Sequence, residues 1–426
     1  MTAEFEVQGV PITELAERFG TPMYLYDGDE LASRVTGLRE HMHPRLEFFF
    51  SLKANPNVAV CAVLHDAGAR AEVSSMAELV TARKAGVAPE NLIFLGPGKS
   101  SEELAACLDE GLYTIVCESF GELEAIDELA RARGIAAPVA LRINPSFAVK
   151  GSGLTMGGKP RQFGIDETQI FANPDLAQRF PHVRLMGVQV YMGTRILSEE
   201  AIAENTERIF ELACRVSDVL EFPLEMVDVG GGLGVAYFDG ERDLDLPLLA
   251  ARVNPIIAEF ADSHPDTRLV MELGRYLTAT SGTYVVCVHY VKESMGERFA
   301  VADGGTNHHM AAVGIGSFVK RNFPMRVLNR IDEPATESWH VTGPLCTPND
   351  TLGKKVALPP VQPGDLVGVL RSGAYGPTAS PVLFLSHGYP AEVLVRNGQA
   401  HLVRSRDTVE DLLRHQHLPD PAVVAD

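Results

Sequence analysis

The sequence predicts an α/β protein in which a (β/α)8 barrel of the TIM type is followed by an all-β domain. Between residues 47 and 273, eight short β-rich runs recur, and amphipathic stretches separate most of them. The span of about 225 residues is near the usual size of such a barrel. After about residue 276, strand-like runs follow one another without a long helix between them. A doubly wound open sheet is the alternative for the first part of the chain.

The expected barrel strands are rich in β-branched and aromatic residues. In chain order they cover residues 47–52, 70–73, 92–95, 113–116, 139–143, 185–191, 225–230 and 269–273. Three of the intervening stretches have a helical spacing of apolar residues, and each ends in a glycine, which commonly terminates a helix. These expected helices cover residues 74–86, 101–111 and 119–134.

The expected β-domain has a different sequence pattern, because proline and glycine residues separate its short apolar runs. Its clearest strand-like runs cover residues 282–291, 297–305 and 365–373. We expect the N-terminal 24 residues to join or cap this domain. The predicted organisation is therefore a barrel at 25–276 and a β-domain formed by 1–24 and 277–426.

The bulk composition excludes several classes of protein. Of the 426 residues, 46% are hydrophobic and 22% are charged, which is ordinary for a globular protein. No apolar run is long enough for a membrane-spanning helix, and the first ten residues do not resemble a signal peptide, so we expect a cytoplasmic protein. The formal net charge of −19 speaks against nucleic-acid binding, which needs a basic surface.

Cysteine and histidine usage predicts no metal site. The six cysteines form no CxxC pair, which speaks against a zinc site and against a disulfide framework. Five of them lie in apolar segments and are expected in the core, whereas Cys346 does not. His308 and His309 are adjacent, and neighbouring residues of a strand face opposite ways, so a shared metal is not expected. Whether this pair touches a substrate stays open.

Functional groups of a (β/α)8 barrel lie at the C-terminal ends of its strands. The first expected strand ends at Lys53, directly after the apolar run 48–52. A lysine there either extends to solvent or is held, partly desolvated, for chemistry. The second strand carries Glu72, the sixth ends near Tyr191 and Thr194, and the eighth ends at Glu272.

A glycine run follows the seventh strand, at Gly230, Gly231 and Gly232, and Gly274 with Arg275 follows the eighth. Loops after these two strands often bind phosphate in barrels. The alternative for the glycines is a tight turn with positive φ. A lysine, a phosphate cradle and a carboxylate suit a phosphorylated aldehyde cofactor. The lysine condenses with the aldehyde as a Schiff base, and the carboxylate keeps a pyridine nitrogen protonated.

Five ordered motifs identify a resemblance over residues 20–400. They are FFFSLKAN (48–55), VDVGGGLG (227–234), ELGRY (272–276), GPLCTPND (343–350) and SGAYG (372–376). Together they resemble the fold-type III pyridoxal-phosphate decarboxylases, which act on diaminopimelate, ornithine or arginine and have alanine racemase as a distant relative. The resemblance implies a barrel with a β-domain, pyridoxal 5'-phosphate as cofactor, and a homodimer with active sites shared between subunits.

The resemblance also implies roles for individual residues. Lys53 matches the lysine that forms the Schiff base, and Glu272 matches the partner of the pyridine nitrogen, which favours a decarboxylase over a racemase. Cys346 matches a catalytic cysteine that the second subunit contributes for protonating the product carbon. The cofactor contacts implied are Lys53, Glu72, Tyr191, Thr194, Gly230, Gly231, Gly232, Glu272, Gly274, Arg275 and Tyr375. The substrate contacts implied are Arg275, Cys346, Thr347 and Tyr375.

Ordinary structural roles remain as alternatives for several of these residues. Glu272 and Arg275 could form a simple salt bridge. Cys346 could be a packed thiol, and Tyr375 could be a core aromatic residue.

Four departures from the family bear on the substrate. Tyr191 stands where many relatives have a histidine that stacks on the cofactor. Thr347 replaces the acidic residue that holds a distal amine, and Ala311 and Ile315 stand where diaminopimelate decarboxylases clamp a distal carboxylate. The loop 153–165 keeps the family's Phe-Gly but carries Lys159 and Arg161. A charged distal end left unpaired in such a site costs several kcal/mol. The far end of the substrate is therefore expected to be neutral or tethered.

One subgroup of the family fits this expectation. The stretches MGGKPRQFG (156–164), GPLCTPNDTLGK (343–354) and SGAYGPTASPVLFL (372–385) are similar to the decarboxylase of L-glutamyl-acyl-carrier protein in butirosin biosynthesis. The resemblance implies a carrier-bound amino acid in secondary metabolism. A local basic dock for an acidic carrier could consist of Lys150, Lys159, Arg161, Lys320 and Arg321. The alternatives are a decarboxylase of free diaminopimelate, ornithine, lysine or a D-amino acid, and, more remotely, a non-catalytic regulator.

Overall fold

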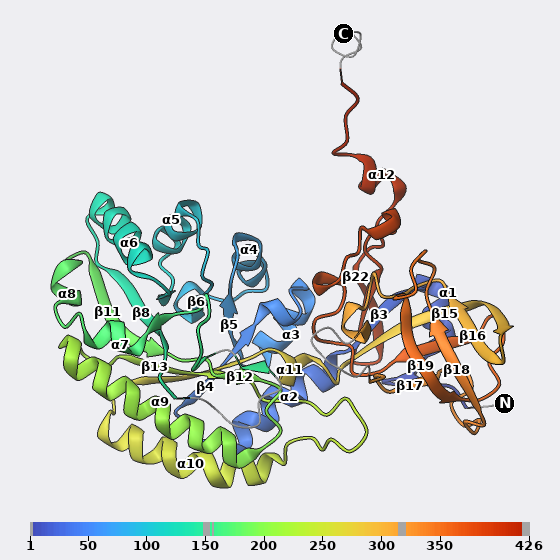
Figure 1. The fold of residues 1–426 in the computed structure, drawn as a ribbon, viewed down its shortest axis with the longest axis horizontal. Coiled ribbons are helices and arrows are strands. Elements are labelled where there is room, and N and C mark those ends of the chain that lie inside the picture. The colour runs from blue at the N-terminus through green and yellow to red at the C-terminus, as the bar shows by residue number, and fades with distance from the viewer. Residues whose placement is uncertain (1–2, 148–153, 156, 314–320, 420–426) are drawn as a thin grey trace. The chain divides into compact units, whose positions relative to one another are not determined.

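The chain forms two compact units (Figure 1). The computed structural model describes residues 3–147, 154–155, 157–313 and 321–419. One unit is Gly28–Ser281, and the other joins Met1–Asp27 to Gly282–Asp426. The boundaries expected from the sequence, 24/25 and 276/277, cut through β3 (Met23–Asp27) and α11 (Arg275–Thr278). The first division lies later because β3 pairs with β15 (Gly282–Ser294) and β21 (Ala391–Arg396) and so belongs wholly to the second unit.

The first unit is a closed barrel of eight parallel strands, as the sequence predicted. Its strands are β4 (Leu46–Ser51), β5 (Arg70–Val73), β6 (Leu92–Phe94), β7 (Thr114–Cys117), β8 (Ala137–Asn144), β11 (Val183–Gln189), β13 (Met226–Gly231) and β14 (Arg268–Leu273). They pair in chain order, and β14 pairs with β4 to close the ring. This closure excludes the open doubly wound sheet, which would leave two edge strands.

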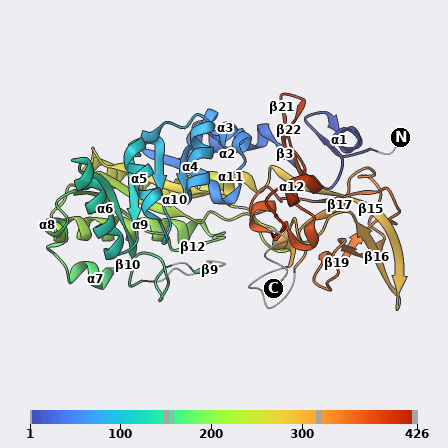
Figure 2. The same cartoon turned by 90° about the horizontal axis from the view of Figure 1, so that it is seen from above.

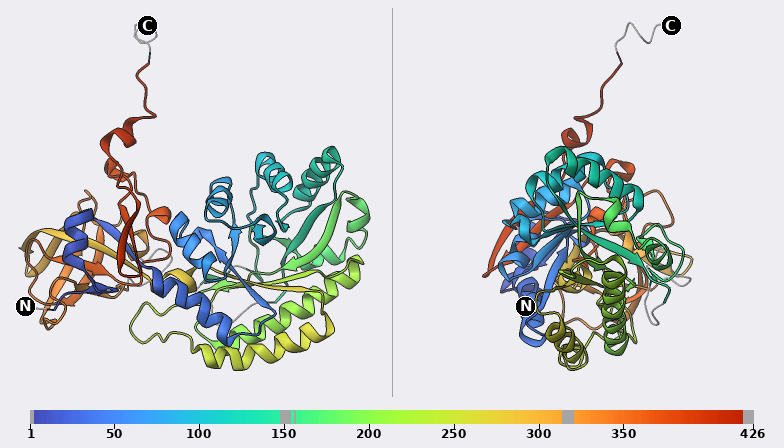
Figure 3. Two further views of the ribbon diagram at one scale, coloured as in Figure 1. Left: turned by 180° about the vertical axis from the view of Figure 1, so that it is seen from behind. Right: turned by 90° about the vertical axis from the view of Figure 1, so that its left-hand side faces the viewer.

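Side chains fill the barrel interior, which explains why the strands are apolar on both faces. One buried cluster takes members from seven of the eight strands, among them Phe49, Val116, Met186 and Val270. The helices cover the outside of the ring, as the right-hand view of Figure 3 shows. Polar side chains that could bind a ligand therefore lie at the strand ends and in the loops that follow them.

The helices of this unit follow the expected pattern. They are α2 (Gly28–His41), α3 (Val58–Asp66), α4 (Met76–Lys84), α5 (Ser101–Glu110), α6 (Phe120–Arg133), α7 (Glu167–Phe171), α8 (Leu176–Arg179), α9 (Glu199–Leu220), α10 (Leu246–Ser263) and α11. Short pieces complete it: η1 (Leu52–Ala54), η2 (Pro89–Asn91), β9 (Leu154–Thr155), β10 (Ile165–Asp166) and β12 (Gly193–Thr194). The glycines expected to end α5 and α6, Gly111 and Gly134, are left-handed C-caps.

The second unit is built on a β-sheet with the strand order β19-β18-β16-β15-β3-β21-β22. Its strands are β1 (Glu6–Val7), β2 (Val10–Pro11), β3, β15, β16 (Glu297–Ala302), β17 (Met325–Val327), β18 (Glu337–Thr342), β19 (Thr351–Leu358), β20 (Leu366–Val369), β21 and β22 (Gln399–Arg404). Its helices are α1 (Ile12–Phe19), α12 (Val409–Leu413), η3 (Met310–Val313), η4 (Pro377–Ala379) and η5 (Phe384–Ser386). Figure 2 shows β15 and β16 running side by side as a long hairpin. In the part of the chain that the structure describes, no helix is both long and apolar enough to cross a membrane.

Candidate active site

Lys53 and Glu72 form an ion pair at the C-terminal ends of two neighbouring strands. Lys53 lies on η1, directly after β4, and Ser51 of β4 pairs with Glu72 of β5. The Lys53 Nζ donates to Glu72 Oε2 at 2.9 Å. The Lys53 side chain is 39% exposed, whereas that of Glu72 is 1% exposed. The lysine is therefore held by a buried carboxylate but remains open to a small reactant.

Glu72 is charged despite its burial. Burial raises the pKa of its carboxyl, but the Lys53 charge and hydrogen bonds from Ser51, Lys53 and Ser74 outweigh burial, so the pKa lies below its ordinary value. The Ser74 hydroxyl donates to Oε1 at 2.8 Å. A fixed negative charge thus orients the ammonium group of Lys53.

Glu272 on β14 is the second buried carboxyl of this barrel end and is only 4% exposed. Gln189 Nε2 donates to its Oε1 at 3.3 Å. Burial, and then the negative charge of Glu72, raise the pKa of Glu272. Asp228 on β13 shares a hydrogen bond with Glu272.

The pKa shifts distinguish Asp228 from Glu272. Burial, followed by the charge of Glu272, raises the pKa of Asp228 well above its ordinary value. Oδ1 of Asp228 accepts from the Gly230 N–H at 2.8 Å. Its Oδ2 has no donor among the described residues, which fits a protonated oxygen that itself donates. We therefore infer that Asp228 binds a proton more readily than Glu272 and that Glu272 is the carboxyl that carries the negative charge.

A cavity of about 380 Å³ joins these groups, and its size suits a small ligand. Lys53, Tyr191 and Glu272, all predicted from the sequence, line it. Its walls also include residues that the sequence did not indicate, chiefly Lys99, Arg142 and Phe163. Residues from six strand ends and the loops that follow them thus line one cavity.

The glycine loops abut the same groups. A Cβ on Gly231 would overlap the carbonyl oxygen of Glu272, and one on Gly230 would lie 3.0 Å from Tyr191 Cδ2. A Cβ on Gly274 would lie 2.8 Å from Ala54 Cβ, in the turn that carries Lys53. Gly230 also has a φ of 66°, so the alternative role of a tight turn with positive φ applies to this glycine. Backbone crowding alone thus demands glycine at Gly230 and Gly231, next to the cavity.

Arg275 extends from the start of α11 to Tyr237. Its Nη1 donates to the Tyr237 hydroxyl at 3.0 Å, and the guanidinium lies 5.5 Å from the ring centroid. Tyr237, which is buried, was not predicted; the only signal was its place in the loop that follows the glycine run. The contact anchors the loop 232–245 beside the glycines.

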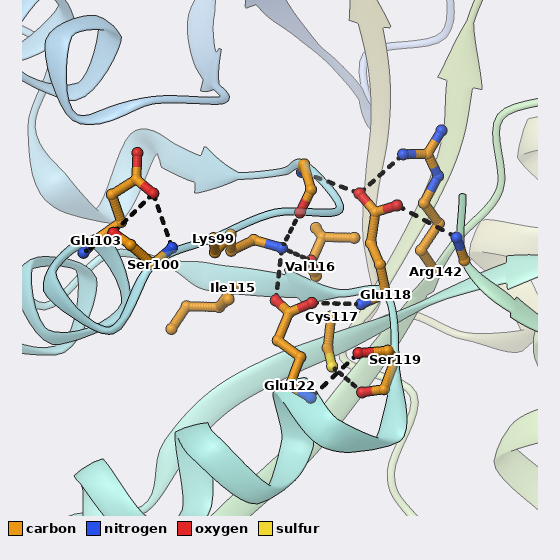
Figure 4. A network of polar contacts seen from close by, with 12 residues as sticks. Lys99, Ser100, Glu103, Ile115, Val116, Cys117, Glu118, Ser119, Glu122 and Arg142 are labelled. Atoms are coloured by element: carbon orange, nitrogen blue, oxygen red, sulfur yellow. Dashed lines mark hydrogen bonds and ion pairs between the residues drawn. The ribbon is translucent and has the colours of Figure 1, made fainter. Parts of the chain in front are cut away.

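A network of buried charges supports one wall of the cavity (Figure 4). Lys99 Nζ donates to Gly96 O, Val116 O and Glu122 Oε1 at 2.6–2.7 Å. The neighbouring carboxylate of Glu118 accepts from Arg142 Nη1 at 2.9 Å. Arg142 in turn lies over the Phe163 ring, 4.7 Å from its centroid. The ion pairs with Glu122 and Glu118 thus hold Lys99 and Arg142, which line the cavity, in fixed positions.

Replacing Lys99 with methionine is expected to lower the free energy of unfolding by about 3–5 kcal/mol, because it leaves Glu122 buried without its cation. The two side chains are only 1% and 8% exposed. Urea denaturation of the full chain measures the change. The double variant Lys99→Met/Glu122→Gln should recover most of the loss, since the glutamine removes the uncompensated charge. A single variant as stable as the wild type would contradict this interpretation.

Three predicted site residues lie in the second unit. Cys346 is exposed, and Thr347 beside it is half-buried, in the loop that follows β18. Tyr375 is half-buried with a φ of 54°, which is uncommon for a residue with a side chain. Of the other five cysteines, Cys214 and Cys287 are half-buried rather than in the core as expected. Cys214 lies on α9 and Cys287 on β15, each at the margin of its packed face.

The remaining residues singled out from the sequence are spread over both units. Thr194 lies half-buried on β12 and does not line the cavity. His308 and His309 are buried and contact Tyr284, Gly388 and Ser372; burial lowers the pKa of each to about 4. Lys159 and Arg161 are exposed, whereas Lys150, Ile315 and Lys320 lie outside the described residues.

The donor set of the cavity fits pyridoxal phosphate. Lys53 offers a reachable primary amine for an aldehyde, and Glu272 offers a carboxylate for a ring nitrogen. The glycine turns pack closely beside Glu272 and Tyr191, and the backbone N–H groups of such turns are a type of donor that binds anions. The amine and the carboxylate line one cavity, and the glycine turns abut Tyr191 and Glu272 of that cavity.

Comparisons with known proteins agree with this chemistry. Residues 29–279 match the family model described as pyridoxal-dependent decarboxylase, pyridoxal binding domain. The chain is 41% identical to the L-glutamyl-[BtrI acyl-carrier protein] decarboxylase of Niallia circulans, over 95% of this chain and 96% of that protein. It is 31% identical to a diaminopimelate decarboxylase of Pseudomonas fluorescens, with 97% of each chain covered.

Solved structures give the same result. The diaminopimelate decarboxylase of Helicobacter pylori complexed with L-lysine superimposes with a TM-score of 0.84 at 28% identity, covering 95% of this chain and 98% of that one. The diaminopimelate decarboxylase of M. jannaschii in co-complex with L-lysine gives a TM-score of 0.88 at 26% identity, with 98% and 96% covered. The chain therefore belongs to the pyridoxal-dependent decarboxylases, as its sequence motifs predicted, and it is a carboxy-lyase that uses pyridoxal phosphate.

Proposed function

We propose that the chain removes the α-carboxylate of an amino acid held as a thioester on an acyl-carrier protein, as a step of secondary metabolism. The observation that carries this proposal is the 41% identity to a decarboxylase of L-glutamyl-acyl-carrier protein, against 28–31% for the diaminopimelate decarboxylases. The experiment is carbon dioxide release from glutamate loaded on a carrier protein, compared with free diaminopimelate, ornithine and lysine. Release from a free amino acid alone would overturn the proposal.

The residues proposed to hold the cofactor include Lys53, Tyr191 and Glu272, which line the cavity. When bound, pyridoxal phosphate supplies a ring that accepts electrons as a carboxylate leaves. Lys53 would hold its aldehyde carbon, and Glu72 orients the Lys53 ammonium. Tyr191 presents an aromatic face to the cavity. The proposed contacts for its phosphate and edges are Thr194, Gly230, Gly231, Gly232, Gly274, Arg275 and Tyr375.

Glu272 would keep the ring nitrogen of the cofactor protonated. A carboxylate at this position favours a decarboxylase over a racemase. A carboxylate beside a pyridine nitrogen favours the protonated ring. Gln189 donates a hydrogen bond to Glu272, which holds the carboxylate in position.

We further propose a homodimer in which Cys346 of one subunit serves the barrel of the other. The family resemblance supports this arrangement, and the exposed position of Cys346 on its loop is consistent with it. The thiol would deliver a proton to the α-carbon, and Thr347, Arg275 and Tyr375 would contact the substrate. The cytoplasm is the compartment proposed, since free thiols persist where glutathione keeps them reduced.

Uncharged residues at the distal positions support a tethered substrate. By the family resemblance, the uncharged residues Thr347 and Ala311 stand where relatives hold a charged distal group. A substrate whose side-chain carboxylate is a thioester carries no charge at that end, so no partner is required. A free diamino acid would leave its second ammonium without a counter-ion, at a cost of several kcal/mol.

Exchanging both Lys159 and Arg161 for glutamate is expected to raise the KM for the carrier-bound substrate roughly tenfold, by repelling an acidic carrier. Both side chains are exposed, and the Lys159 carbonyl accepts from Asn144 Nδ2, so this segment is attached to the end of β8. Steady-state kinetics with carrier-bound glutamate measure the effect. The KM for a short glutamyl thioester without the carrier should not change.

A matched charge reversal controls for net charge. Lys84 and Arg131 are exposed in the last turns of α4 and α6, at the barrel end opposite to the strand C-termini. Their exchange for glutamate should leave the KM for the carrier-bound substrate unchanged. An equal rise in both double variants would show a general charge effect and contradict a local dock.

Decarboxylation of a free amino acid is the second candidate, favoured by the full-length similarity to diaminopimelate decarboxylases. Release of carbon dioxide from free diaminopimelate at a higher kcat/KM than from carrier-bound glutamate would establish it. A non-catalytic regulator is the remote alternative, and the intact Lys53–Glu72 pair disfavours it.

A further inference from the structure

Asp350 is a buried carboxyl in the loop that carries Cys346. It is 3% exposed. Its Oδ1 accepts from the Thr306 N–H at 2.7 Å and from the Thr306 hydroxyl at 3.0 Å. Its Oδ2 accepts from the Leu345 N–H at 2.7 Å. One side chain therefore holds two separate stretches of backbone.

The sheet topology explains why these stretches meet. β16 and β18 are parallel neighbours, with Ala300 opposite Val341 and Val301 opposite Thr342. Their C-terminal ends lie at the same edge of the sheet, so the segments 303–306 and 343–350 leave from adjacent points. Asp350, at the end of the second segment, reaches the first through Thr306.

Two glycines leave room for this carboxylate. A Cβ on Gly305 would overlap Asp350 Oδ1, and one on Gly343 would lie 2.5 Å from Oδ2. Each glycine belongs to one of the two segments. The carboxylate therefore packs directly against backbone on both sides, which leaves it little freedom.

The same residue closes the Cys346 loop. The Gly343 N–H donates to the Asp350 carbonyl at 3.3 Å, and the Asp350 N–H donates to the Thr347 carbonyl at 3.1 Å. The Leu345 N–H binds the Asp350 carboxylate. Cys346 lies between Leu345 and Thr347, so Asp350 fixes the backbone before and after it. The Cys346 side chain itself points outward and is exposed.

A comparison with Asp365, a second buried carboxylate of the same unit, indicates that Asp350 holds the loop in a defined conformation. Asp365 is also buried, and its Oδ2 is 2.6 Å from Arg330 Nη2, in a charge-balanced pair. The recorded partners of Asp350 in the described part of the chain are N–H and O–H groups without charge. Burying a carboxylate on neutral donors is costly, and donors on both segments define one loop conformation.

We propose that Asp350 is a positioning residue that sets the place of the Cys346 thiol for proton delivery. This inference rests on the proposed role of Cys346. It names a residue that acts through the loop backbone and does not itself touch the substrate. It also assigns a reason for the two glycines, since any side chain there would displace the carboxylate.

The test is alkylation of Cys346 in the full-length protein, with and without pyridoxal phosphate. Peptide mass spectrometry measures the rate at Cys346, the most exposed of the six cysteines. We expect the cofactor to slow alkylation in the wild type. In Asp350→Asn we expect this protection to fall by roughly tenfold, and kcat by a factor of about 10², because a thiol displaced by an ångström reacts poorly. Borohydride should still link the cofactor to Lys53.

Asp365→Asn is the matched control, because it alters a buried carboxylate of the same unit that does not contact the Cys346 loop. It should lower stability but keep the protection of Cys346. If Asp350→Asn does not fold, Thr306→Val removes only one donor and should give a partial loss of protection. Full protection and an unchanged kcat in the variant that folds would overturn the inference. A wild type whose Cys346 gains no protection from the cofactor would instead overturn the proposed role of Cys346, and this inference with it.

Discussion

Replacing Lys53 with alanine is expected to abolish the covalent attachment of pyridoxal phosphate and to lower turnover by at least about 10³-fold. The reason is the position of its amine, since Lys53 is 39% exposed at the cavity and is oriented by Glu72 at 2.9 Å. Borohydride reduction followed by peptide mass spectrometry should find the cofactor on the segment 47–57 of the wild type. The variant should show no cofactor adduct and should keep its fold.

The second lysine of the cavity provides the control. Lys99 lines the same space, but it is 1% exposed and donates to three acceptors of the protein. Its amine is therefore committed to structure, and Lys99→Met, where folded, should still bind the cofactor covalently. An adduct on Lys99, or a wild type that stays colourless with added cofactor and traps nothing, would refute the assignment of Lys53.

Replacing Glu272 with glutamine is expected to lower kcat by about 10²–10³-fold while covalent cofactor binding persists. The neutral amide cannot favour a protonated ring nitrogen as the carboxylate does. Carbon dioxide release measures kcat, and the absorbance of the bound cofactor as a function of pH reports the protonation of its ring. The pH at which this absorbance changes should fall in the variant, because the protonated ring loses its counter-ion.

Replacing Asp228 with asparagine should be much less harmful, with a loss of kcat below about tenfold. Burial and Glu272 raise the pKa of Asp228, so a neutral amide is expected to resemble its favoured form. Asparagine keeps an acceptor for the Gly230 N–H and a donor for Glu272. If Asp228→Asn were as damaging as Glu272→Gln, the negative charge would have to be assigned to Asp228 instead.

Local sequence patterns predicted the barrel because the residues of each strand and helix are consecutive and carry the periodicity of that element. The eight strands appeared within a few residues of their final limits, and α5 and α6 ended at the expected glycines, whereas the C-cap of α4 is Ala85, one residue before the expected Gly86. Lys53 could be placed at a strand end from the apolar run before it. The strand β3 was not expected, because its residues belong to a sheet whose other members lie more than 250 residues later.

The amino-acid sequence by itself determined the fold class, the family and the place of Lys53 at a strand end, since these depend on periodicity and on motifs of a few consecutive residues. Only the tertiary structure decided which carboxyl keeps its proton, which lysine stays reachable and which residues brace the Cys346 loop. Those properties depend on the register between strands far apart in the chain. Gln189 and Asp228 face each other across β11 and β13, Gly231 and Glu272 across β13 and β14, and Asp350 meets Thr306 where β16 and β18 end. Burial at those meeting points, which no local pattern encodes, then sets the charge of each group.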